Sequence, residues 1–94
     1  MLVKFISIER HFSGRYALSE IMLNPKHIVM LAEAPSWKRR LQEGQLPDGL
    51  HEATTFSRVV LTESSPHQSE MVLVGTPSEI QSKILKNQKH LLRG

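Results

Sequence analysis

The sequence contains no cysteine and only one tryptophan among its 94 residues. The lack of cysteine excludes a disulfide framework and a thiolate metal site, and it is typical of a reducing compartment. Long apolar runs are also missing, because the longest, IVMLA at 28–32, is far too short to span a bilayer. Lys4 interrupts the first residues, which therefore contain no apolar core of signal-peptide length. We expect a cytoplasmic protein with no membrane span.

Length and composition indicate one folded domain, 1–94. The chain is 39% hydrophobic and 22% charged, which are proportions of a globular rather than a disordered protein. No acidic residue follows Glu79, so the C-terminal segment is basic although the formal net charge of the chain is only +3. The basic residues of this segment are Lys83, Lys86, Lys89 and Arg93. The rest of the chain is therefore slightly acidic.

Five segments are predicted to be β-strands because they are rich in β-branched and aromatic residues and lie between turn residues. These segments are 1–9, 16–23, 28–33, 56–63 and 70–74. Asn24-Pro25 predicts a turn between the second and third, since asparagine bonds the backbone two residues on and proline presets φ. Short links between consecutive strands predict antiparallel pairing. The residues expected in the core are Val59, Leu61, Val72, Val74, Met22 and Met30.

Residues 35–56 form an irregular insert that contains two prolines and two glycines. Within it, residues 37–43 either continue the loop or form a short helix with Ser36 at its N-cap and Gly44 beyond its end. In such a helix Trp37 and Leu41 share one face.

The clearest element is a C-terminal helix over 76–92. Thr76 stands at the N-cap, Pro77 at the first helical position and Glu79 at the third, which together form a capping box. Lysines crowd its C-terminal half, where positive charge complements the helix dipole. The fold class is therefore α+β: a small twisted antiparallel β-sheet or open barrel of about five strands with one C-terminal helix.

The sequence offers no arrangement typical of catalysis, of a cofactor site or of a metal site. No two of its histidines are spaced as ligands on one helix turn, and HEATT lacks the second histidine of a zinc-protease helix. The single aspartate lies in Pro-Asp-Gly, which is turn chemistry, and the glycines are too dispersed for a phosphate-binding loop. The histidines are His11, His27, His51, His67 and His90. We expect a protein that is not an enzyme.

Two basic segments are candidate interaction sites. The first is Trp37, Lys38, Arg39 and Arg40, which could contact nucleic acid or anchor an acidic partner. Its structural alternative is a helix whose tryptophan packs on the sheet while the cations stay solvated. The second is the basic helix end, which could contact nucleic acid or an anionic membrane face, or could simply be a solvated helix face. Exposed apolar residues on an edge strand would instead indicate self-association.

The order of EIMLNPKHIVMLAE, SRVVLT and EMVLVGTPSEIQSKI resembles the small FlbD-like proteins linked to bacterial flagellar operons. The positions that match are Leu23, Asn24, Ile28, Leu61, Val72, Val74, Thr76, Glu79 and Ile80. The chain departs from that family in the length of 35–56 and in SSPHQSE, where a glycine turn is expected. The resemblance implies a non-enzymatic cytoplasmic accessory protein without catalytic residues.

The expected function is therefore a small protein-interaction or accessory module that binds a protein partner or a second copy of itself. The alternative is a nucleic-acid-binding module that uses residues 37–40 and the basic C-terminal helix. That alternative requires the two basic segments to lie on one face of the molecule.

Overall fold

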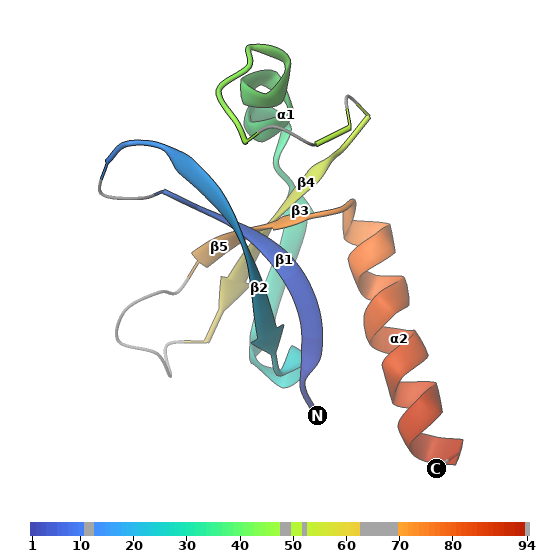
Figure 1. Cartoon of the computed structure of the whole chain (residues 1–94). Coiled ribbons are helices and arrows are strands. Elements are labelled where there is room, and N and C mark those ends of the chain that lie inside the picture. The colour runs from blue at the N-terminus through green and yellow to red at the C-terminus, as the bar shows by residue number, and fades with distance from the viewer. Residues whose placement is uncertain (11–12, 48–49, 52, 63–69, 94) are drawn as a thin grey trace.

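The computed structural model describes residues 1–10, 13–47, 50–51, 53–62 and 70–93, and for 88–93 only the backbone. A five-stranded antiparallel sheet carries two α-helices (Figure 1). The elements are β1 (Val3–Arg10), β2 (Tyr16–Leu23), a 3₁₀ turn η1 (Pro25–His27), β3 (Ile28–Glu33), α1 (Pro35–Gln42), β4 (Phe56–Leu61), β5 (Glu70–Val74) and α2 (Pro77–Arg93). The predicted α+β class, with an open antiparallel sheet and a C-terminal helix, is confirmed.

The strand order is β2-β1-β5-β4-β3, and every neighbouring pair is antiparallel. The prediction that consecutive strands pair fails for β2 and β3, which form the two edges of the sheet although only Asn24 and η1 join them. The strands instead form a hairpin, β1–β2, and a three-stranded unit, β3–β4–β5. These units join through the pairs Ser7↔Leu73 and Ile8↔Val72.

Strand alternation divides the buried residues into two clusters on opposite faces of the sheet. The first core cluster lies between the hairpin and the three-stranded unit, and Ile80 of α2 completes it. Its buried members are Val3, Phe5, Val59, Leu73 and Ile80. The second core cluster lies on the other face, beneath α1 and the insert. Its buried members are Ile8, Ala34, Leu46 and Phe56.

The predicted turn at Asn24-Pro25 is confirmed. The Asn24 side-chain oxygen accepts a hydrogen bond from the Lys26 N–H at 3.0 Å, and Pro25 begins the 3₁₀ turn. The Thr62 N–H donates to the His27 carbonyl at 2.8 Å, which ties the turn to the end of β4. The turn therefore redirects the chain from one edge of the sheet to the other.

The insert contains a helix, so the structure has one helix more than the C-terminal helix of the predicted fold. Ser36 is not the N-cap, because the helix begins at Pro35 and its N-cap is Ala34, which makes no side-chain cap bond. Proline is preorganised for the first helical position, and this fixes the start one residue earlier. Gly44 lies beyond the end with φ of +73°, a left-handed conformation that favours glycine.

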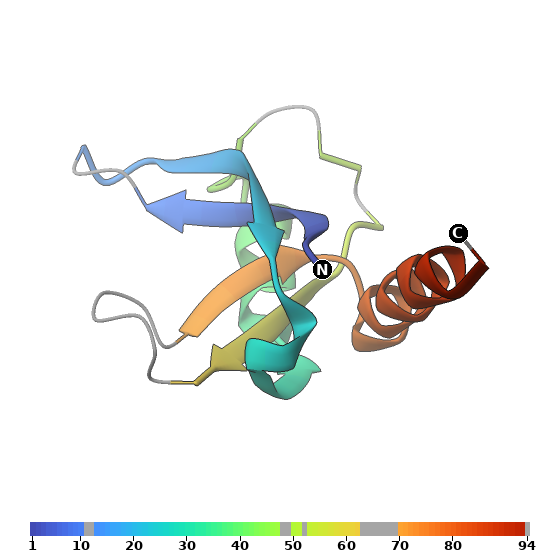
Figure 2. The same ribbon diagram turned by 90° about the horizontal axis from the view of Figure 1, so that it is seen from below.

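The start of α2 has the predicted cap. The Thr76 hydroxyl oxygen accepts a hydrogen bond from the Glu79 N–H at 3.1 Å, and Pro77 opens the helix. Immediately before it, the Ser57 hydroxyl donates to the Gly75 carbonyl at 2.7 Å inside the protein. These contacts fix the point at which α2 leaves β5, and the helix then projects beyond the sheet (Figures 1 and 2).

Replacing Thr76 with alanine is expected to lower the free energy of unfolding by about 1 kcal/mol, because the helix loses its side-chain cap. Urea denaturation followed by circular dichroism measures this loss. Ser78→Ala is the matched control, since Ser78 is exposed in the first turn of the same helix. Equal stability of the two variants would contradict a capping role for Thr76.

Candidate functional site

Trp37 lies at the centre of an aromatic and cationic contact between α1 and the hairpin. Its ring meets that of Tyr16 edge to face, with centroids 5.1 Å apart and planes at 77°. The Arg40 guanidinium carbon lies 4.4 Å from the centroid of the Trp37 ring and 5.8 Å from that of Tyr16. Trp37 and Leu41 both pack, partly buried, against the second core cluster. The tryptophan therefore supports the fold and also lines the surface.

The other cations of α1 remain solvated to different degrees. Arg39 is exposed, whereas Lys38 and Arg40 are partly covered. In the described part of the chain none of the three forms an ion pair. The planar Arg40 guanidinium is held over two aromatic rings, which restricts the side chain before any ligand binds.

Three further residues of this site, Arg10, Arg15 and Tyr16, were not predicted. Arg10 and Tyr16 are direct cross-strand partners at the loop end of the hairpin, and Arg15 precedes Tyr16. These residues are far from Trp37 in the sequence. A signal that could have found them is the turn at Gly14, which places the end of the first predicted strand beside the start of the second.

Two open cavities lie at this end of the molecule and share Arg10 and Tyr16 as lining residues. One has a volume of about 470 Å³ and extends along β1 and β5 to Trp37. The other has a volume of about 570 Å³ and lies between the hairpin end and the insert. The residues that complete the second cavity are Gly14, Arg15, Gln45, Leu46 and Pro47. We call the two cavities together the hairpin groove.

The basic end of α2 does not join this site. The Lys83 Nζ lies 5.3 Å from the centroid of the Phe5 ring, and Lys86 is exposed. The side chains of Lys89 and Arg93 lie outside the described residues. In Figure 1, α1 is at the top of the view and the distal part of α2 is at the bottom. α1 and the distal part of α2 therefore lie at opposite ends of the molecule.

The two histidines whose side chains are described contact a hydroxyl group and a backbone N–H. The Nδ1 atom of His27 lies 3.2 Å from the Thr62 hydroxyl oxygen, and that of His51 accepts the Ala53 N–H at 3.0 Å. His11, His67 and the side chain of His90 lie outside the described residues. Within residues that the structure describes, no group of three or more histidine, aspartate or glutamate side chains could hold a metal ion.

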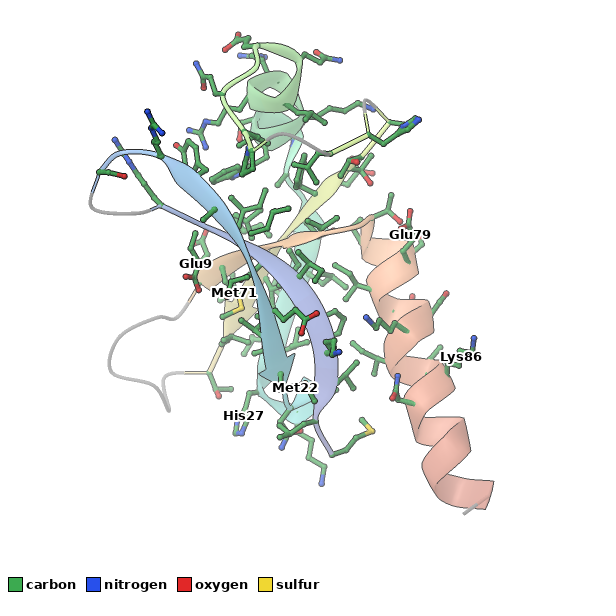
Figure 3. All side chains as sticks on the ribbon, viewed as in Figure 1. Glu9, Met22, His27, Met71, Glu79 and Lys86 are labelled. Carbon is green, nitrogen blue, oxygen red and sulfur yellow. The ribbon has the colours of Figure 1, made fainter. Side chains whose placement is uncertain are left out.

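The two edge strands expose large apolar side chains. Val29 of β3 is 65% exposed and Met22 of β2 is 53% exposed, and Leu18 and Met30 on the same edges are also exposed. The prediction that Met22 and Met30 belong to the core is therefore wrong. Both side chains lie on the sheet face that carries the second core cluster, but away from the buried members of that cluster. Figure 3 shows Met22 near His27, where η1 connects the two edges.

Comparisons with protein-family models, with curated proteins and with solved structures found no match. Across the described residues, no helix combines the length and apolar character needed to cross a membrane.

Proposed function

We propose that this chain is a small, non-enzymatic, cytoplasmic module that binds a protein partner or a second copy of itself through the edges of its sheet. The observation that supports this function most strongly is the exposure of apolar side chains on both edge strands. An edge strand offers unpaired backbone N–H and C=O groups to an incoming strand, and apolar side chains beside them add buried area on binding.

The composition of the edges supports the same function. Proteins usually protect an exposed edge with lysine, proline or an inward-pointing charge. Neither β2, YALSEIML, nor β3, IVMLAE, contains a lysine or a proline, and each contains a single glutamate. Both edges therefore lack the usual lysine and proline protection against pairing with an added strand.

The resemblance to FlbD-like proteins agrees with a bacterial accessory role, because that family implies a binding protein without catalytic residues. The alternative of a nucleic-acid-binding module requires residues 37–40 and the end of α2 to act together. Their positions at opposite ends of the molecule argue against a joint phosphate-binding surface. Salt-dependent binding of an oligonucleotide, with a steep loss of affinity as salt rises, would revive that alternative.

Val29→Lys tests the edge directly, because it places a charge on the most exposed apolar side chain of β3. We expect the variant to weaken self-association or partner capture about tenfold, equivalent to ~1.4 kcal/mol. Sedimentation equilibrium measures association between copies, and quantitative affinity capture from the native cell extract measures a heterologous partner. Circular dichroism should show an unchanged fold.

Leu85→Lys is the matched control, since Leu85 is 49% exposed on α2 and lies on no strand edge. This variant should associate like the original chain. The proposed function is contradicted if Val29→Lys and Leu85→Lys lose the same amount of self-association or partner capture. It is also contradicted if the original chain remains monomeric and captures no protein at all.

A further inference from the structure

Strands β1 and β5 separate before they end. Their described pairing stops at Ile8↔Val72, although β1 continues through Glu9 and Arg10 and β5 begins two residues earlier, at Glu70. On their other sides both segments stay paired, Arg10 with Tyr16 and Glu70 with Val60. Two strand edges therefore face each other across a gap inside the sheet.

This gap is the first cavity of the hairpin groove. Its volume of about 470 Å³ lies within the usual range for ligand pockets. Apolar groups line part of it, from Ile8, Trp37, Met71 and Val72, while Glu9 and Glu70 add carboxylates. Figure 3 shows Glu9 and Met71 near one another on this side of the molecule. The cavity thus combines strand edges with a place for an apolar side chain.

The second cavity has a different charge. Arg10 and Arg15 line it together with Gln45, and its described lining residues include no acidic side chain. In the described part of the chain neither arginine forms an ion pair. Arg10 and Tyr16 line both cavities, so the apolar part and the basic part lie next to each other.

We propose that the hairpin groove binds an extended peptide segment of a protein partner, in which an apolar residue is followed or preceded by acidic residues. The apolar residue occupies the first cavity, where the peptide backbone bonds to the free edges of β1 and β5. The acidic residues lie over the second cavity and pair with Arg10 and Arg15. This site includes Tyr16 at the start of β2 but none of the exposed apolar side chains of the two edge strands, so it is a second contact surface.

The charge pattern favours a peptide over a nucleic acid. A phosphate backbone needs positive charge along its whole path, whereas the carboxylates of Glu9 and Glu70 line the first cavity beside Arg10. Only the second cavity has arginines without an acidic side chain among its described lining residues. Arg58 offsets Glu70 through an ion pair of 3.6 Å, but Glu9 has no ion pair with a described residue. Arg40 also covers the Trp37 ring at 4.4 Å, in the position that a stacking base would need.

The single tryptophan makes the test direct, because Trp37 lines the first cavity and reports on its occupancy. A random 12-residue peptide library displayed on phage is selected on the intact chain, and the enriched peptides are titrated while Trp37 fluorescence is recorded. We expect enrichment of peptides with an apolar residue beside acidic residues, and a saturable change in emission. A thymidine oligonucleotide titrated in parallel tests the nucleic-acid alternative.

Arg15→Glu should lower the affinity of the chain for the selected peptides about tenfold. It should raise the affinity for versions of these peptides in which lysine replaces the acidic residues. Lys86→Glu makes the same charge change on α2 and should leave both titrations unchanged. The proposal is overturned if no such peptides are enriched, if Arg15→Glu binds them as well as the original chain does, or if the oligonucleotide displaces them. Val29→Lys should bind these peptides normally, so this result and the edge experiment succeed or fail independently.

Discussion

Replacing Leu73 with alanine is expected to lower the free energy of unfolding by about 2–5 kcal/mol. The Leu73 side chain is fully buried at the centre of the first core cluster, where β5 pairs with both β1 and β4. Alanine removes apolar area and leaves a cavity that the surrounding strands cannot fill without losing their register. A domain of this kind has roughly 5–15 kcal/mol of total stability, so the change takes a large share of it.

Urea denaturation at equilibrium measures this effect as a shift of the midpoint with an unchanged slope. Leu85→Ala removes the same atoms from a half-exposed position on α2 and should change the stability by no more than about 0.5 kcal/mol. If the Leu73→Ala variant were as stable as Leu85→Ala, Leu73 would not be the fully buried residue of the first core cluster that the structure shows.

Replacing Trp37 with alanine is expected to lower the free energy of unfolding by about 3 kcal/mol. This is the lower end of the range for replacing a buried tryptophan with alanine, because the Trp37 side chain is only partly buried. The loss includes packing on the second core cluster, the edge-to-face contact with Tyr16 and the contact with Arg40. The same denaturation experiment measures it.

Arg40→Ala separates these contributions. It removes the cation from both rings while leaving the tryptophan in place, so we expect a loss of about 0.5–1 kcal/mol. If Trp37→Ala lowers the free energy of unfolding by no more than Arg40→Ala does, the tryptophan does not stabilise the second core cluster.

Local chemistry explains which parts of the fold could be predicted from the sequence. Asn24, Pro25, Thr76 and Pro77 act on backbone groups one to three residues away, so their effects are visible in a short window. The strands could be predicted because β-branched and aromatic residues are concentrated in short segments between turn residues. The helix over 37–43 was one of two alternatives because Ala34 provides no capping side chain that would signal its start.

Contacts between distant segments explain what could not be predicted. A turn motif such as the one at Asn24 predicts that the chain changes direction, but it does not predict which strand the next segment will pair with. The placement of β2 and β3 on opposite edges depends on the pairing of Ile8 with Val72. The meeting of Arg10, Tyr16 and Trp37 follows from that pairing, and so does the exposure of Met22 and Met30.

The narrow junction between β1 and β5 has a consequence for the order in which the chain folds. The hairpin forms from neighbouring residues, whereas Ser7↔Leu73 and Ile8↔Val72 join segments far apart in the sequence and close a long loop. Such a long-range contact is slow to form, so we expect the hairpin to appear early and its docking to limit the folding rate. Until docking is complete, Val3 and Phe5 remain exposed to other chains.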